Sequence, residues 1–339
     1  MNAADDVCGA IREAGGAIPF ERFMELALYG PHGFYAGAGR AGRRGDFITS
    51  PEVGPLFGAV VARFLDAEWD RLGQPDEFTV VDAGAGPGTL ARSVLAASPA
   101  CRHALRYVAV ERTDAQRRSH PAGVESLADL PAGRFVGVVI ANELLDDLPF
   151  RLAVLDGGWR EAFVTEDGGS FVEVLSAPFE PVPDALPQSA PHGARAPLHD
   201  RATAWVDRAR SMLSSGTVVA FDYARPTTAE LASRPWREWL RTYRAHDRGG
   251  HYLAEPGAQD ITIEVALDQL PPPTSVATQA EWLRRWGIDE LVAEGRAAWS
   301  ASAAAPDLAA LAMRSRVAES EALLDSVGLG AFLVAEWRA

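Results

Sequence analysis

The sequence predicts an α/β fold in which a parallel sheet carries helices on both faces. Residues 78–175 alternate between apolar runs that are typical of strands and stretches with helical spacing. Such alternation indicates a parallel sheet joined by crossover helices. At 339 residues and 47% hydrophobic, the chain can bury a large core, as one elaborated domain or as two. The predicted strands lie near 78–83, 106–111 and 135–141, and the predicted helices near 88–97 and 113–119.

Residues 1–75 predict a helical segment that is interrupted by a loop. Residues 18–28 have apolar side chains at helical spacing, and residues 53–72 return to that spacing after a stretch rich in glycine and arginine. Between them, glycines precede Asp46 and a helix start follows it. This arrangement predicts that residues 45–52 form a hinged cover over a binding site.

The remainder of the chain adds an antiparallel meander and further helices. Short strands separated by Gly-Gly pairs predict the meander over 151–175, and the six prolines of residues 176–197 predict an extended surface connection. The meander strands lie around 152–155, 160–165 and 171–175, a helix covers 200–213, and two strands cover 217–222 and 330–337. We therefore expect three regions, an N-terminal helical segment with its cover loop (1–75), an α/β core (76–225) and a substrate-side helical region with a final strand (226–339).

Two pairs of tryptophans in the last region have helical spacing. Trp236 and Trp239 are three residues apart, and Trp282 and Trp286 are four apart, so each pair would share one face of a helix. Core packing is the simplest role for both pairs.

The most informative motif follows the first predicted strand. An apolar run ends in Asp82 and leads into a turn with alternate glycines and then a helix. Glycine lets the backbone approach a ligand that a Cβ atom would exclude. A dinucleotide-binding fingerprint would need a further glycine where Thr89 stands, which makes a nicotinamide dehydrogenase the weakest interpretation. The spacing instead favours an S-adenosylmethionine-binding turn, formed by Gly84, Ala85, Gly86 and Gly88.

The second predicted strand ends in Glu111, roughly 25 residues after the first glycine, which suits one βαβ crossover. Glu111 would then lie beside the glycine turn and accept hydrogen bonds from both ribose hydroxyls. Leu127 or Asp129, further along the chain, would lie near the adenine.

Asn142 and Glu143 follow the third predicted strand directly. Ligands of doubly wound sheets bind outside the carboxyl ends of the strands, so these residues, the glycine turn and Glu111 should converge on one crevice. Asp146 and Asp147 would share a helix face with Glu143, which suits a bound cation. The alternative is that the three acids only complement the positive end of a helix macrodipole.

Composition excludes several function classes. The chain has no lysine, which excludes Schiff-base chemistry and a phosphate-loop lysine, and its net charge of −14 argues against a nucleic-acid partner. Cys8 and Cys101 form neither a disulfide framework nor a metal cluster, so no metal is expected. No run of 18 apolar residues predicts a membrane span. The acidic residues 1–6 resemble neither a signal nor a transit peptide, and we expect a cytoplasmic protein.

With these motifs in place, the chain resembles the MidA-type S-adenosylmethionine-dependent methyltransferases, whose mitochondrial members act in the assembly of respiratory complex I. The likeness is carried by blocks at 27–35, 45–53, 82–90, 140–149 and 256–262, and 279–287 extends it. The resemblance implies a Rossmann-like class I methyltransferase sheet with an inserted or appended substrate region. It also implies S-adenosyl-L-methionine as cofactor and methylation of a protein arginine.

Roles for individual residues follow from the motif and the resemblance together. Asp82 would hold the amino group of the cofactor, the glycine turn its methionine part, and Glu111 its ribose. Asp46 and Asn142 would contact both cofactor and acceptor. The residues expected on the catalytic side are Asp46, Asn142, Glu143, Asp146, His246 and Asp260.

The chain departs from the family pattern at several positions, and these keep alternatives open. Asp82 replaces a usual Glu and Ala224 a usual Gly, while Glu264 and Ala266 replace a usual His and Asp on the substrate side. A tailoring methyltransferase for a small-molecule or peptide metabolite would vary that side. A cofactor-binding assembly factor without turnover is the non-enzymatic alternative. The expected partner is a protein or small-molecule methyl acceptor, and a homodimer is left open.

Overall fold

The computed structural model describes residues 2–36, 49–244, 247–302 and 307–339. Its centre is a seven-stranded sheet in the order β16-β17-β10-β5-β2-β3-β4, in which β17 alone runs antiparallel to both of its neighbours. The chain order reverses between β2 and β5, which places a crevice outside their carboxyl ends. The strands are β2 (Phe78–Ala83), β3 (Leu105–Val110), β4 (Glu125–Leu127), β5 (Phe135–Asn142), β10 (Leu213–Asp222), β16 (Ser275–Thr278) and β17 (Leu333–Arg338).

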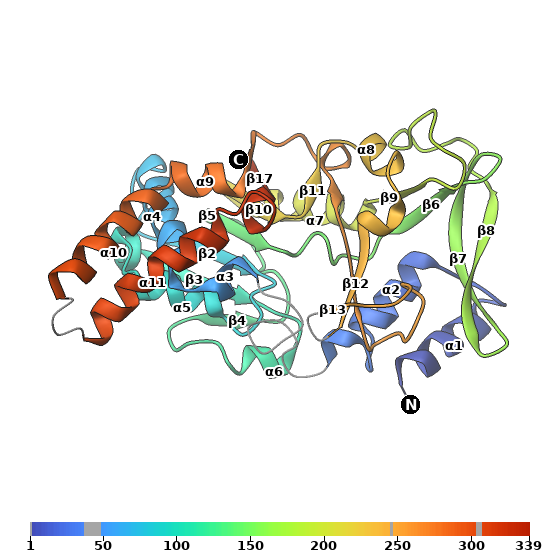
Figure 1. Cartoon of the computed structure of the whole chain (residues 1–339), viewed down its shortest axis with the longest axis horizontal. Helices are drawn as coiled ribbons and strands as arrows, with labels where there is room; N and C mark the ends of the chain where they lie inside the picture. The colour runs from blue at the N-terminus through green and yellow to red at the C-terminus, as the bar shows by residue number, and fades with distance from the viewer. Residues whose placement is uncertain (1, 37–48, 245–246, 303–306) are drawn as a thin grey trace.

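Both faces of this sheet are buried, because successive side chains of a strand point to opposite sides. Val138 and Ile140 of β5 pack into one apolar cluster, and Val139 and Ala141 pack into another. The first cluster lies under α4, α5, α9 and α10, and the second lies under α7 (Figure 1). The helices of the core are α4 (Pro55–Arg71), α5 (Thr89–Ala96), α6 (Asp114–Arg117), α7 (Asp200–Ser211), α9 (Gln279–Arg285), α10 (Ile288–Ser302) and α11 (Leu308–Leu323).

A second, antiparallel sheet is inserted between β5 and β10 and confirms the predicted meander. Its order is β1-β7-β6-β9, with β8 paired to β7. The N-terminal helices pack against it in a separate apolar cluster, and Ile18 of β1 pairs with Val164 of β7. The elements are α1 (Ala3–Glu13), β1 (Ile18–Pro19), α2 (Phe20–Tyr29), β6 (Arg151–Leu155), β7 (Trp159–Asp167), β8 (Ser170–Pro178) and β9 (Arg195–Leu198).

Residues 226–339 contain strands as well as helices and divide between the two halves of the molecule. Leu240, Ile261 and Ile263 join the cluster beneath α1 and α2, whereas α9 and α10 join the cluster of the main sheet. The prediction of a mainly helical substrate-side region is therefore too simple. The small elements are β11 (Ala224–Arg225), α8 (Thr228–Ala232), β12 (Leu240–Arg244), β13 (Asp247–Arg248), β14 (Asp260–Ile263) and β15 (Val265–Ala266).

The four tryptophans pack as core residues, although one pair is not helical. Trp282 lies in α9 and contacts Phe64 of α4 with ring centroids 5.2 Å apart. Trp236 is instead the first residue of a short 3-10 turn, η3 (Trp236–Glu238), and Trp239 follows the turn directly. The predicted helix face is wrong for this pair.

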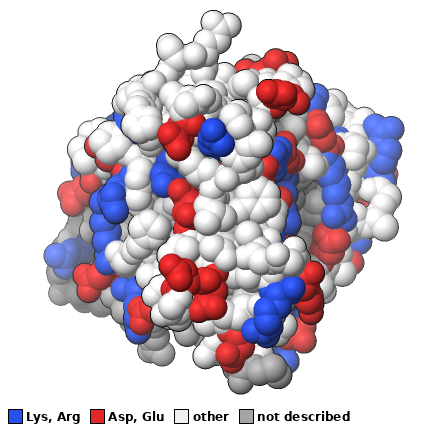
Figure 2. All heavy atoms as spheres, turned by 90° about the vertical axis from the view of Figure 1, so that its right-hand side faces the viewer, with Lys and Arg blue, Asp and Glu red and all other residues white. Residues whose placement is uncertain are grey.

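The surface carries both charges. Figure 2 shows Arg and Asp or Glu side chains interspersed over the face that α1, β7 and β8 contribute to. Within the described ranges, no helix is long and apolar enough to cross a membrane.

Candidate functional site

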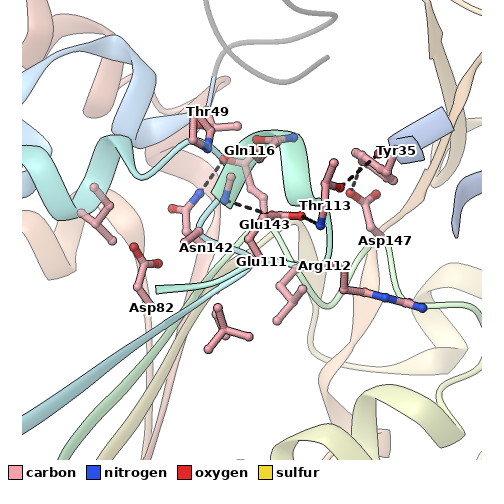
Figure 3. A pocket seen from close by; sticks show the side chains of 18 of the residues that line it. Tyr35, Thr49, Asp82, Glu111, Arg112, Thr113, Gln116, Asn142, Glu143 and Asp147 are labelled. Atoms are coloured by element: carbon pink, nitrogen blue, oxygen red, sulfur yellow. Dashed lines mark hydrogen bonds between the residues drawn. The ribbon is translucent and has the colours of Figure 1, made fainter. Parts of the chain in front are cut away.

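A cavity of about 530 Å³ opens at the carboxyl ends of β2, β3 and β5. The glycine turn, the loops after β3 and β5, and residues 49–52 all contribute to its wall (Figure 3). This is the crevice that the strand ends predict. The predicted site residues that line it are Asp82, Gly84, Ala85, Gly86, Glu111, Asp129, Asn142 and Glu143.

The glycine turn needs its glycines for their backbone conformation. Gly84, Gly86 and Gly88 have φ values of 72°, 52° and 80°, in the left-handed region that other residues rarely adopt. A Cβ atom on Gly86 would also lie 3.3 Å from Oε1 of Gln116. Gly88 was predicted to contact the cofactor, but it is the N-cap residue of α5, faces His120 and does not line the cavity.

Glu111 ties the loop after β3 to the glycine turn. Its carboxylate accepts hydrogen bonds from the backbone N–H groups of Gly86 at 3.1 Å and Thr113 at 2.8 Å. A carboxylate offers about four acceptor positions, so two remain for hydroxyl donors. The geometry leaves Glu111 able to bind a ribose while it holds the turn in place.

Asp129, which follows β4, lines the cavity, whereas Leu127 at the end of β4 does not. The Asp129 carboxylate is held at 3.1 and 3.2 Å by Arg208 of α7, and these hydrogen bonds lower its pKa. Leu127 packs against the apolar core and does not line the cavity, which corrects one of the two adenine candidates. Its neighbours Ala128 and Leu130 line the wall instead.

Asp82 is buried at the base of the glycine turn. It accepts a hydrogen bond of 3.0 Å from the Tyr107 hydroxyl. Burial raises the pKa of Asp82 to about 7, although the hydrogen bond from Tyr107 acts in the opposite direction. A cation bound beside Asp82 would stabilise the ionised carboxylate.

Residues after Asn142 form a turn and not the predicted helix. Glu143 has a φ of 50°, unusual for a residue with a side chain, and its N–H donates to the carbonyl of Phe221 at 2.8 Å. The Glu143 carboxylate accepts a 3.0 Å hydrogen bond from Asn142 Nδ2. Burial, and then the charge of Asp146, raise the pKa of Glu143 to about 8. Such backbone outliers concentrate at functional sites.

This turn sends the three acids in different directions. Glu143 and Asp147 line the cavity, while Asp146 does not. Asp146 accepts a hydrogen bond of 2.5 Å from Thr262 Oγ1, beside the buried Asp222. The predicted shared helix face is therefore wrong, and Asp146 supports the site from behind.

Two tyrosines close the end of the cavity that contains Asp147. The rings of Tyr29 and Tyr35 stack with centroids 5.4 Å apart, and both line the cavity. The Tyr35 hydroxyl lies 2.7 Å from Asp147 Oδ2, and the two side chains point toward one another in Figure 3. Asp260, at the start of β14, is fully buried behind Tyr35 and does not line the cavity.

Sequence reasoning missed these tyrosines as site residues, although block 27–35 contains them. It also missed Gln116, and it expected the cover loop without singling out Glu52. The Thr89 hydroxyl donates to Glu52 at 2.5 Å, which fastens the last residue of the predicted cover to α5, while residues 45–48 of that prediction lie outside the described residues. Asp46 and His246 lie outside the described residues.

Three buried oxygen atoms of the cavity residues lack a hydrogen-bond partner among the described residues. They are Oε1 of Gln116, Oδ1 of Asn142 and Oδ1 of Asp147. Leaving such atoms unpaired is costly, so they suit a ligand with several N–H or O–H donors. No group of three or more metal-binding side chains occurs in the described part of the chain.

Glu264 and Ala266, the two substrate-side departures from the family pattern, do not line the cavity but bond to residues outside its wall. Glu264 is buried and binds Arg225, Arg234 and Arg241 at 2.7, 2.8 and 2.5 Å. Burial alone would raise the pKa of Glu264, but hydrogen bonds from Arg234 and Arg225 lower it overall. The N–H of Ala266 donates to Nε2 of the buried His199 at 3.0 Å.

Several known proteins are similar to this chain in sequence or in fold. A Drosophila melanogaster relative, named "Protein arginine methyltransferase NDUFAF7 homolog, mitochondrial", is 31% identical over 74% of this chain. The human protein arginine methyltransferase NDUFAF7, mitochondrial, is 25% identical over 75% of it. The chain spans 65% of the length of each of these relatives.

A solved structure from Burkholderia thailandensis, described as a "likely methyl transferase" and bound to S-adenosyl-homocysteine, matches with a TM-score of 0.83. It is 30% identical, and the match covers 99% of this chain and 92% of that one. The model of the family described as "Putative S-adenosyl-L-methionine-dependent methyltransferase" matches residues 60–283. The chain therefore belongs to this family, the MidA-type S-adenosyl-L-methionine-dependent methyltransferases.

Proposed function

We propose that this protein transfers the methyl group of S-adenosylmethionine to an arginine side chain of a protein. The observation that carries the proposal is the charge of the cavity. Among the residues that the structure describes, six with a carboxyl group line it against one guanidinium, that of Arg112. A negative cavity suits a cofactor with an ammonium and a sulfonium, together with a cationic acceptor. The acidic residues are Glu52, Asp82, Glu111, Asp129, Glu143 and Asp147.

The residues of the glycine-turn end fit the cofactor. Asp82 would hold the ammonium, which favours its ionised form, and Glu111 would accept from the ribose. Oε1 of Gln116 and the carboxylate of Asp129 supply further acceptors for hydroxyl or amino donors. When bound, the cofactor supplies an electrophilic methyl group on a positively charged sulfur.

Glu143 and Asp147 would hold the acceptor at the other end. A guanidinium is protonated at neutral pH, and only carboxylates and aromatic faces bind it well once water is excluded. Asp147 offers an unpaired Oδ1, and the stacked rings of Tyr29 and Tyr35 form a wall against which a planar cation can pack. The protein's task is alignment of the acceptor nitrogen with the methyl group.

Methylation of a guanidinium also releases one proton, since the product is again a cation. Glu143 is suited to accept it at Oε2, because Oε1 already accepts from Asn142. Without a ligand its pKa of about 8 keeps Glu143 mostly protonated at neutral pH, and a bound guanidinium would favour the ionised carboxylate that can accept the proton.

The names of the relatives support the arginine assignment, and the departures at Glu264 and Ala266 do not argue against it. Those residues lie outside the cavity wall, so they leave the chemistry of the acceptor end unchanged. The relatives are named mitochondrial. A cytoplasmic location and a homodimer remain predictions for this chain.

The test is to incubate the protein with radiolabelled S-adenosylmethionine and lysate of the source organism, then to hydrolyse the labelled material. Label in methylated arginine is the expected result. Label in a small metabolite would overturn the arginine assignment. Calorimetric binding of S-adenosylhomocysteine without any transfer would instead support the cofactor-binding assembly factor.

A further inference from the structure

A second cavity, of about 190 Å³, lies beside the β12–β13 hairpin. Arg237, Arg241, Arg248 and His251 line it, and no Asp or Glu is found among the described residues of its wall. The chain as a whole carries a net charge of −14, and the described wall of the first cavity has more acidic than basic side chains. The charged side chains of the second cavity therefore have the opposite sign from the net charge of the chain and from the acids of the first cavity.

The positive charge of this cavity is only partly neutralised. Arg241 is paired with Glu264 at 2.5 Å. Arg237 and Arg248 have no ion pair with any other residue that the structure describes. Among the acids of the hairpin and the turn that follows it, Glu255 is bound by Arg244 at 2.6 Å, and Asp247 is exposed.

Arg237 is positioned in a way that leaves its hydrogen-bonding edge available. Its guanidinium carbon lies 4.2 Å from the centroid of the Trp236 ring. Stacking of this kind uses the flat face of the guanidinium, while its N–H groups point outward in the plane. The stack holds the cation in place without neutralising it.

The lowered pKa of His251 agrees with positive charge at this cavity. Burial of part of the ring lowers its pKa, and the charges of Arg237 and Arg195 lower it further, against an opposing effect of Glu173. Arg195 itself is bound by Glu173 at 2.5 Å. The excess charge at the ring therefore comes from Arg237 on the cavity side.

We propose that the second cavity binds an oxyanion, either a carboxylate or a phosphate group, between Arg237 and Arg248 with His251 alongside. Guanidinium groups bind such oxyanions through charge-assisted, often bidentate hydrogen bonds. The site is separate from the cavity at the glycine turn, and the proposal does not depend on methyl transfer. The anion can be free or can belong to an acidic side chain of a bound protein.

The test uses the histidine-labelled protein and NMR. Inorganic phosphate is added at constant pH, with sodium chloride at the same ionic strength as the comparison. We expect a saturable shift of the His251 signals with phosphate and a rise of the His251 pKa, while the signals of His192, on the 176–197 connection, follow ionic strength alone. Equal shifts of His251 in phosphate and chloride would overturn the proposal.

Variants locate the binding. Arg237→Gln and Arg248→Gln should each weaken phosphate binding about tenfold, through loss of one charge-assisted contact. Both side chains are exposed, so folding should be unaffected, which a thermal melt checks. Arg244→Gln removes a charge from the same hairpin outside the cavity and should leave binding unchanged. An unchanged phosphate affinity in the Arg237→Gln, Arg248→Gln double variant would refute the site.

A second titration distinguishes the sources of the anion. A short glutamate-rich peptide is compared with acetate and with the same peptide carrying glutamine. Peptide binding that is tighter than acetate and is lost in the glutamine peptide assigns the site to an acidic protein segment. Equal binding of peptide and acetate assigns it to free anions. Failure of phosphate, acetate and peptide alike to shift His251 saturably would contradict the proposal.

Discussion

The Tyr35 hydroxyl joins two buried carboxyl groups, since it lies 2.7 Å from Oδ2 of Asp147 and 3.1 Å from Oδ1 of Asp260. A hydroxyl carries one proton, so it can donate to only one of them at a time. The other contact is favourable only if that carboxyl carries a proton of its own. Burial, and then the charges of Asp146 and Asp260, accordingly raise the pKa of Asp147. A cation bound beside Asp147 would favour loss of this proton and so restore the negative charge of the carboxylate.

Removing this hydroxyl should damage the acceptor end and spare the cofactor end. Tyr35→Phe keeps the stack with Tyr29 but leaves two carboxyls without their shared donor, so we expect a loss of about 1–3 kcal/mol in folding stability. Methyl transfer should fall at least about tenfold through a changed KM for the acceptor. Urea unfolding and steady-state kinetics measure these effects. A variant with weakened S-adenosylhomocysteine binding and a normal acceptor KM would contradict the assignment of the two ends.

Gly86 should be essential for cofactor binding. Gly86→Val places a branched side chain at a left-handed position that faces Gln116, and we expect calorimetry to detect no S-adenosylhomocysteine binding. Gly123→Val is the matched control, because Gly123 has a φ of 85° but open space around it and lies outside the cavity. The control should bind normally. Unchanged affinity in Gly86→Val would remove the glycine turn from the cofactor site.

Glu111 should contribute to affinity in two ways. Glu111→Ala removes the ribose acceptor and also frees the N–H groups of Gly86 and Thr113, so affinity for S-adenosylhomocysteine should fall by about 1–3 kcal/mol. Glu111→Gln keeps one oxygen acceptor and should lose less. Calorimetry of both variants checks the order, and an effect near zero in Glu111→Ala would place the ribose elsewhere.

The stability of the protein without ligand should fall as the pH rises through neutrality. The pKa of Glu143 is about 8 in the folded protein against 4.5 ordinarily, so the folded state binds more protons than the unfolded state between these values. Each pH unit in that window should then cost up to about 1.4 kcal/mol from this group. Glu143→Gln should flatten the decline in urea unfolding between pH 5 and pH 8, as measured against the exposed control Glu321→Gln. A decline of equal steepness in both variants would show that Glu143 ionises normally.

The central strands of the main sheet could be predicted from the sequence, because a strand that is buried on both faces is a continuous apolar run. β2, β3 and β5 are short apolar runs that end in polar residues, and their carboxyl ends meet wherever the sheet forms. Glu111 and Asn142 were therefore predictable as cavity residues. β4 was missed because it has three residues, of which two are exposed.

The acceptor end was less predictable, since it depends on tertiary placement. The sequence spacing of the acids at 143, 146 and 147 fits a helix, but the chain forms a turn there. The difference lies in the backbone of Glu143, whose left-handed conformation the spacing does not reveal. Tyr29 and Tyr35 reach the cavity because α1 and α2 dock on the inserted sheet, which periodicity does not reveal. Leu127, predicted near the adenine, does not line the cavity, whereas the next residue, Ala128, does.

The most direct test of arginine methylation compares wild type with Glu143→Gln, which keeps the shape of the side chain and removes its charge. Transfer of labelled methyl groups is measured on arginine peptides and on neutral metabolites, with S-adenosylhomocysteine affinity as the control. We predict labelled arginine with wild type, and in Glu143→Gln a loss of about 100-fold in transfer with cofactor affinity nearly unchanged. Robust methylation of a neutral metabolite by Glu143→Gln, with none of arginine by wild type, would contradict the account.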